Sequence, residues 1–278
     1  MVFITTQSLR AEINRQHAMS KDISTEQSKI STGHKLNAPS DDPQAWVQIS
    51  LLGRQQAITT AWQDNLTFAQ SRSAKAEANL NDINNLMTRV SNLLVTSTST
   101  ADGSPGREAV AQELEGVRAT INDLLNQTDY QGQPVFDDTN TLPVPVGAGL
   151  SVESVGTRQS ISDNVVGARS LDQVLTDAIA AVRTGTADDR TNALGDARKA
   201  LDHVIVAQSI QGVRTQRLED IGERLVDQQL GLSERRSGLE DTDLTETITK
   251  LQNKLTTLEA AQSAFARISR QSLFDYLN

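Results

Sequence analysis

The chain has 278 residues, a formal net charge of −9 at pH 7, no cysteine, and aromatic side chains at only 3% of its positions. The negative charge argues against nucleic acid as a partner, because binding to a phosphate backbone depends on clustered Lys and Arg. The absence of Cys excludes disulfides and thiolate zinc sites, and the scarcity of aromatics favours long thin helical packing over a large globular core.

The first predicted helix carries a seam of alternating four- and three-residue steps that ends at Gly33, a good C-terminal cap residue. A short apolar segment, Val2-Phe3-Ile4, precedes it. The apolar members of the seam are Leu9, Ile13, Ile23 and Ile30, and the polar ones are Gln16, Ser20 and Gln27.

The second predicted helix begins at Ser40-Asp41-Asp42-Pro43. Asp42 suits the N-cap position and Pro43 suits the first helical position, where its missing N–H costs nothing. A catalytic or metal-binding role for Asp41 and Asp42 is disfavoured, because no His or third carboxylate is spaced to join them.

From Ala45 to Leu94 the heptad pattern is unbroken, and a helix from Pro43 to Val95 would be roughly 80 Å long at the usual rise per residue. About half of the seam residues are small or polar, so the seam makes a poor core by itself. Two interpretations stay open: a slender monomeric bundle, or a seam completed by neighbouring subunits.

The middle of the chain changes character twice. A Ser/Thr/Gly-rich turn over 96–106 precedes a helix marked by Val110, Leu114, Val117, Ile121 and Leu124, which should fold back as an antiparallel hairpin. Gly and Pro then punctuate 128–167, and the β-prone pieces 142–146, 150–155 and 160–166 predict two or three short strands. Gly147-Ala148-Gly149 is expected to be a hairpin turn rather than a phosphate loop, since no Lys-Ser/Thr follows it.

The last third is again helical. A short helix over 171–182 and a capping turn over 184–189 lead into a heptad pattern over 194–239, and 237–243 reads as a break with capping acids. The closing helix, 244–277, has the most regular seam and an apolar tip just before Asn278. Its seam and tip residues are Leu244, Ile248, Leu251, Leu255, Leu258, Phe265, Ile268, Leu273, Phe274, Tyr276 and Leu277.

No enzyme motif is present in the sequence. His17, His34 and His203 are far apart and have no nearby metal-ligand partner, and no Gly-x-Ser-x-Gly, His-Glu-x-x-His or Walker pattern occurs. We therefore expect no enzymatic activity, cofactor or metal. Met1–Ile4 lacks the features of a Sec-type signal peptide, and no apolar run approaches the roughly 20 residues of a membrane span, so no membrane partner is expected.

Several stretches resemble the bacterial flagellin family. Residues 30–43 resemble the family's N-terminal S-x-G-x-[KR]-[IL]-x-x-[AP]-[SA]-D-D pattern, and 126–136 its N-x-x-x-x-G-x-x-[LVI]-F turn into β structure. Residues 240–244 and 272–277 resemble its C-terminal helix start and tail. Ser40-Asp41-Asp42-Pro43 and the closing 260–277 are more similar to the branch that forms the hook–filament junction than to filament flagellins.

The resemblance implies a mainly α fold: long antiparallel helical hairpins formed by the N- and C-terminal segments, with a small β-hairpin insert between them. It implies a structural subunit of the flagellum that polymerises through its terminal helices at the hook–filament junction, and that is exported through the flagellar type III apparatus to the cell exterior. The alternatives are a filament flagellin and, more distantly, a coiled-coil adaptor that does not polymerise. The implied partners are further copies of the chain, hook-associated proteins, flagellin and an export chaperone.

The expected organisation is an N-terminal assembly segment (1–42, disordered until polymerised), two rod halves (43–128 and 169–239), a β insert (129–168) and a C-terminal assembly helix (240–278). In a free subunit the apolar tips cannot bury enough area to offset the entropy of ordering them, whereas a polymer supplies partners. The predicted assembly residues are Val2, Phe3, Ile4, Leu9, Ile13, Ile23, Ile30, Leu244, Ile248, Leu251, Leu255, Leu258, Phe265, Ile268, Leu273, Phe274, Tyr276 and Leu277.

Overall fold

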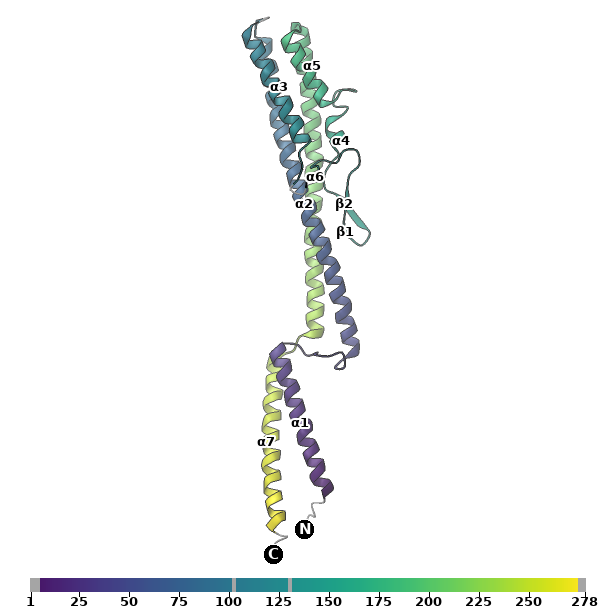
Figure 1. Ribbon diagram of the computed structural model, residues 1–278, viewed down its shortest axis with the longest axis vertical. Coiled ribbons are helices and arrows are strands. Elements are labelled where there is room, and N and C mark those ends of the chain that lie inside the picture. The colour runs from purple at the N-terminus through teal and green to yellow at the C-terminus, as the bar shows by residue number, and fades with distance from the viewer. Residues whose placement is uncertain (1–5, 102–103, 130–131, 275–278) are drawn as a thin grey trace. The chain divides into compact units, whose positions relative to one another are not determined.

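The computed structural model describes residues 6–101, 104–129 and 132–274 (Figure 1). Within these ranges seven helices and one β-hairpin form, which confirms the predicted mainly helical fold with a small β insert. Their bounds in chain order are α1 Thr6–Thr32, α2 Pro43–Thr98, α3 Pro105–Leu125, β1 Pro143–Gly147, β2 Leu150–Glu153, α4 Arg158–Ser162, α5 Leu171–Arg183, α6 Ala187–Glu240 and α7 Leu244–Phe274.

The chain divides into two compact units. The first combines Met1–Ala57 with Leu230–Asn278, and the second is Ile58–Gln229. The long helices α2 and α6 contribute residues to both units, whereas α1 and α7 belong to the first unit, and α3, α4, α5 and the β-hairpin belong to the second. The predicted assembly segments 1–42 and 240–278 both fall within the first unit.

The core of the second unit is a helical bundle that follows the predicted heptads. On α2, Leu80, Ile83, Met87, Val90 and Leu94 recur at three- and four-residue steps and are at most 1% exposed. Because this spacing places all five on one face, α2 meets its neighbours along a continuous apolar stripe. The facing residues include Leu114 and Ile121 on α3, Leu171, Leu175 and Val182 on α5, and Ala197, Ala200 and Val204 on α6.

Ion pairs join α3 to α5 at the surface of this bundle. Arg118 binds both carboxylate oxygens of Asp172, at 2.6 and 2.7 Å. Arg183 reaches Glu115 at 2.7 Å and Glu108 at 3.0 Å. The hydrogen bonds from Arg118 hold the pKa of the Asp172 carboxyl below its ordinary value despite partial burial. These pairs hold α3 and α5 together at the surface of the bundle.

The β-hairpin packs on α2 and α6. Val144 pairs with Val152 in the antiparallel register, and a bulge lies between Pro145 and Gly147. The turn predicted at Gly147-Ala148-Gly149 is confirmed, and Gly149 has a φ of +71°, which glycine adopts without strain. The inward residues Val144, Val146 and Val152 form a second apolar cluster with Leu66, Ala69, Leu218, Ile221 and Leu225.

The third β-prone piece, 160–166, is not a strand. Its first part is the short helix α4, whose N-terminus is capped by the Thr157 hydroxyl, which accepts a hydrogen bond from the Ser160 N–H at 3.1 Å. Ile161 and Val165 are buried in the bundle core. The apolar residues of this piece are therefore satisfied by packing onto the helices, and its first backbone N–H groups are satisfied locally rather than by a neighbouring strand.

The sixth helix is longer at both ends than its heptads suggested. It begins at Ala187, where the Thr186 hydroxyl accepts a hydrogen bond from the Asp189 N–H at 3.2 Å and the Asp189 carboxylate accepts one from the Thr186 N–H at 2.8 Å. It continues through Gly238 to Glu240, so the predicted break over 237–243 shrinks to 241–243. The helix tolerates its glycines because each costs only about 1 kcal/mol of propensity.

Candidate assembly interface

Helices α1 and α7 contact each other in the first unit, close together where α1 ends and α7 begins and diverging toward their other ends (Figure 1). The α1 face that is buried or half-buried recurs at four- and three-residue steps, and so does that of α7. The α1 face consists of Glu12, Gln16, Met19, Ile23, Glu26 and Ile30, and the α7 face consists of Thr247, Leu251, Lys254, Leu258, Ala261 and Phe265.

This seam is rotated by about one residue from the apolar rows seen in the sequence. Ile23 is 7% exposed, and Ile30, Leu251, Leu258 and Phe265 are half-buried. The remaining described members of those rows point away from the seam, with exposures of 41% for Ile13, 47% for Leu244, 41% for Ile248 and 40% for Leu255. Half of each predicted row therefore pairs the two helices, and the other half stays available to another chain.

Several predicted assembly residues fall outside the described part of the chain. Val2, Phe3, Ile4, Tyr276 and Leu277 lie beyond it altogether. For Leu9, Ile268, Leu273 and Phe274 only the helical backbone is described, not the side chain. The disorder expected of 1–42 before polymerisation concerns another state of the chain and stays a prediction.

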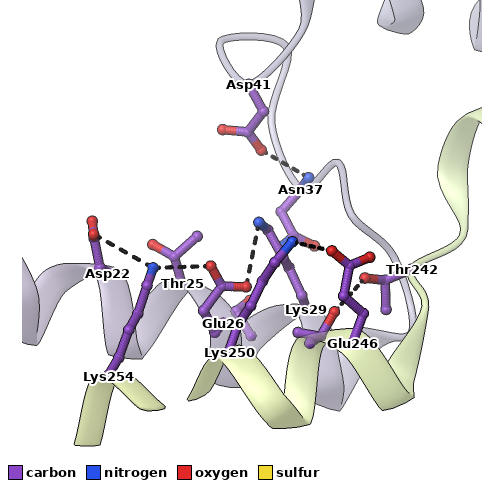
Figure 2. A network of polar contacts seen from close by, with 12 residues as sticks. Asp22, Thr25, Glu26, Lys29, Asn37, Asp41, Thr242, Glu246, Lys250 and Lys254 are labelled. Carbon is purple, nitrogen blue, oxygen red and sulfur yellow. Dashed lines mark hydrogen bonds and ion pairs between the residues drawn. The ribbon is translucent and has the colours of Figure 1, made fainter. Parts of the chain in front are cut away.

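A polar network lies in the α1–α7 seam toward the end of α1, and Figure 2 shows its members converging from both helices. Glu26, which is 8% exposed, receives a hydrogen bond from Lys254 Nζ at 3.1 Å and lies 3.5 Å from Lys29 Nζ. Lys254 also reaches Asp22, at 3.4 Å. A buried carboxylate is tolerated here because two cations neutralise it.

Charge and burial act against each other on this pair. Burial raises the pKa of Glu26, but the hydrogen bond from Lys254 and the charge of Lys29 outweigh it, so the pKa lies below its ordinary value of 4.5. Burial lowers the pKa of Lys254, but the hydrogen bond to Glu26 and the charges of Glu26 and Asp22 raise it above its ordinary value of 10.5. Both side chains therefore stay charged at neutral pH.

The chain segments at the ends of α1 and α7 are tied together. The Lys35 N–H donates to the Glu240 carbonyl at 2.8 Å, and the Thr242 N–H donates to the Gly33 carbonyl at 2.9 Å. Gly33, with a φ of +75°, makes the sharp exit from α1 that this pairing requires. His34 lies beside this link, with its Nδ1 3.4 Å from an Asp241 carboxylate oxygen.

Acidic side chains cap the neighbouring helices. Asp42 Oδ1 accepts hydrogen bonds from the Gln44 and Ala45 N–H groups, both at 3.0 Å, and Pro43 follows it as the first residue of α2. Asp41 accepts from the Asn37 and Ala38 N–H groups instead, which lowers the pKa of its carboxyl. Asp243 accepts from the Glu246 N–H at 3.0 Å at the start of α7. Asp41 thus stabilises the turn before α2, and Asp42 caps the N-terminus of α2.

More apolar side chains are exposed elsewhere in the first unit. Trp46, Val47 and Leu51 near the start of α2 are 37%, 59% and 50% exposed, and Leu230 on α6 is 57% exposed. Among the described residues no three His, Cys, Asp or Glu side chains gather as metal ligands do, and no helix is long and apolar enough to cross a membrane.

Sequence reasoning missed half of the seam, whose members are mostly polar and are buried or half-buried. Glu12, Met19, Glu26, Thr247 and Lys254 belong to it although each lies one residue from the apolar rows. The sequence does contain a signal for these residues. In each helix a second set of residues repeats at three- and four-residue steps, one position away from members of the apolar row. Charged residues within this second set hid it from a search for apolar periodicity.

Comparison with known proteins shows which family the chain resembles. Residues 4–141 match the bacterial flagellin N-terminal helical region, and residues 192–277 match the bacterial flagellin C-terminal helical region. The chain is 25% identical to flagellar hook-associated protein 3 of Escherichia coli (strain K12) over 88% of this chain and 90% of that relative. It is 26% identical to phase 1 flagellin of Salmonella naestved, over 49% of this chain and 27% of that relative. A putative flagellar hook-associated protein from Vibrio parahaemolyticus shares the fold, with a TM-score of 0.67 at 17% identity over 72% of this chain and 100% of that one.

Proposed function

Since the chain belongs to the bacterial flagellin family, we propose that it is a structural subunit of the flagellum that assembles through α1 and α7 at the hook–filament junction. The observation that carries this proposal is the division of the terminal apolar rows. One half pairs α1 with α7, and the other half, Ile13, Leu244, Ile248 and Leu255, is at least 40% exposed. A two-helix hairpin leaves this half without cover, and a polymer supplies it.

The energy of assembly follows from the same surface. At about 25 cal/mol per Å² of apolar area, covering a few such side chains per subunit supplies several kcal/mol. The polar centre of the α1–α7 seam adds little net stability by itself, because the gain from pairing Glu26 with Lys254 is offset by their desolvation. The hairpin therefore gains most of its stability when its outer row is buried by neighbours.

The extent of the similarity supports the junction over the filament. The likeness to flagellar hook-associated protein 3 runs through nearly the whole of both chains, including the short middle region, whereas the likeness to phase 1 flagellin covers half of this chain and about a quarter of that flagellin. A filament flagellin, major or minor, is the alternative. An adaptor that does not polymerise is more distant, since it has no use for the exposed apolar row of Leu244, Ile248 and Leu255 on α7.

The partners follow from this position. The subunit contacts further copies of itself and other axial proteins of the flagellum, namely hook-associated proteins and flagellin. It reaches the cell exterior through the flagellar type III apparatus with the help of an export chaperone. The predicted assembly residues at the two chain ends, Val2, Phe3, Ile4, Leu273, Phe274, Tyr276 and Leu277, belong to the same proposal.

Localisation on the organelle tests the proposal. The chain lacks Cys, so a single cysteine introduced at the exposed residue Ala148 accepts a fluorescent dye uniquely. We expect one labelled band between hook and filament in the bacterium that encodes the chain. Label along the whole filament would favour the flagellin alternative. A diffuse cytosolic pool with no label on the organelle would favour the adaptor.

A further inference from the structure

We propose that the Glu26–Lys254 pair, together with the backbone link from Thr242 to Gly33, sets the register of α1 against α7, and that the apolar residues around the pair do not select an alignment. The consequence of this inference rests on the proposed function. Identical subunits can pack alike only if the exposed residues Ile13, Leu244, Ile248 and Leu255 lie at the same positions along the helix axes in every copy. The register itself is a property of the single chain.

The apolar part of the seam does not distinguish between registers one heptad apart. On α7, Leu251, Leu258 and Phe265 repeat every seven residues, so a slip by seven brings one large apolar side chain to the place of another. On α1, Ile23 and Ile30 repeat in the same way. Apolar packing alone is non-directional and leaves such alignments close in free energy.

The alternate positions of the seam do distinguish between them. On α7 these are Thr247, Lys254 and Ala261, so only one of the three carries a charge. A slip by one heptad in either direction brings Thr247 or Ala261 to the place of Lys254. Glu26 would then lose its cation from α7, and Lys254 would face Met19 or Gly33 instead of a carboxylate.

The other charges nearby do not replace this contact. Lys29 lies 3.5 Å from Glu26 but is on the same helix. This pair is therefore kept in every register and does not favour one alignment of α7 over another. Glu246 and Lys250 pair with one another along α7, at 2.6 Å. Asp22 adds to the selection, because it reaches the same ammonium group of Lys254 from α1. A single buried polar pair that specifies alignment at little gain in stability is known from coiled coils.

Distances between spin labels can test the register directly. Ala18 and Ser263 are exposed on α1 and α7, and replacing both with Cys gives the only two labelling sites in the chain. A slip by one heptad moves one label along the axis by about 10 Å relative to the other. Electron–electron resonance is measured on the free chain, with and without trimethylamine N-oxide, which favours compact states without adding a partner.

We expect one narrow distance distribution in the otherwise unaltered chain. In Glu26→Gln and in Lys254→Gln a second distribution should appear, with the ratio of the two registers shifted by roughly tenfold or more, as expected when one partner of a largely buried pair is removed. Lys199→Gln is the matched control, because it removes the same charge from a pair internal to α6, with Asp196, and should leave one distribution.

The variant Glu26→Leu/Lys254→Leu separates register from stability. Two apolar side chains in place of the pair should keep or increase the helix content measured by circular dichroism, yet allow both registers. A single register in this variant would overturn the inference, and so would a distribution in the unaltered chain as broad as that in Glu26→Gln. Failure to assemble by a chain with one register would count against the proposed function alone.

Discussion

Gln211 on α6 donates its side-chain amide to the Ser73 hydroxyl on α2 at 2.7 Å, inside the second unit, where both residues are at most 1% exposed. The same amide donates to the Ser154 carbonyl at 2.8 Å, just after β2. One buried amide thus joins two helices to the β insert, which makes it a link between the bundle and the hairpin.

Replacing Gln211 with Ala should lower the free energy of unfolding by about 2 kcal/mol, because the buried Ser154 carbonyl loses this donor and the Ser73 hydroxyl keeps only Thr215 as a partner. Urea denaturation followed by circular dichroism measures the change. Gln216→Ala is the matched control: Gln216 is exposed and bonds only within α6, to Asp220. A loss equal to that of the control would show that the link has no energetic role.

Replacing Ile248 and Leu255 with Ser should sharply reduce incorporation into the organelle while leaving the fold unchanged. Both side chains are about 40% exposed on α7, so the free chain loses little burial, whereas an assembly loses apolar area on every subunit. Incorporation is measured by immunoblotting of purified hook–filament complexes. The control is Thr249→Ser/Thr256→Ser, on exposed polar positions of the same helix. Normal incorporation of the Ile248/Leu255 variant would contradict the assigned interface.

Acid should weaken the pairing of α1 with α7. The folded-state pKa of Glu26 lies below 4.5, so the carboxylate stabilises the pair above that pH, and this contribution is lost as the pH falls through the lowered value. Lys254 has a raised pKa, so its contribution is present below 10.5 and is lost only as the pH rises above that value. Helix content recorded between pH 7 and pH 3 should fall less steeply in Glu26→Gln than in the unaltered chain. Equal slopes would remove Glu26 from the explanation.

Deleting 273–278 should leave the second unit folded and abolish incorporation. The core of that unit uses none of these residues, since it is formed by α2, α3, α5, α6 and the β-hairpin. Limited proteolysis should therefore release a protected fragment of the same size from both forms. Incorporation of the shortened chain at the normal level would show that the tail is dispensable for assembly.

The sequence predicted well those parts of the fold in which only one face of a helix carries a regular apolar repeat. Leu80, Ile83, Met87, Val90 and Leu94 place an apolar residue at every seam position, and all five are buried. The turn at Gly147-Ala148-Gly149 was equally determined, because few sequences other than glycine-rich ones accept a positive φ there.

The parts that it could not predict depend on partners remote in sequence. In α1 two neighbouring rows of residues could form the buried face. Contacts with α7 decide which of them does, and those contacts cannot be read from local sequence because Glu26 and Lys254 are 228 positions apart. The 160–166 piece has strand propensity, yet Ile161 and Val165 are buried in the apolar core of the helical bundle. In both cases tertiary contact overrode the local pattern.

The β-hairpin has a consequence for engineering. Its inward residues, Val144, Val146 and Val152, anchor it to α2 and α6, whereas Ala148 and Gly149 at its tip are exposed. Residues inserted at the tip would leave the two strands anchored as they are. The free-energy cost of the insertion would be the entropy of closing a longer loop, which grows slowly with loop length. The tip is therefore a suitable display point for a peptide epitope or a small guest domain.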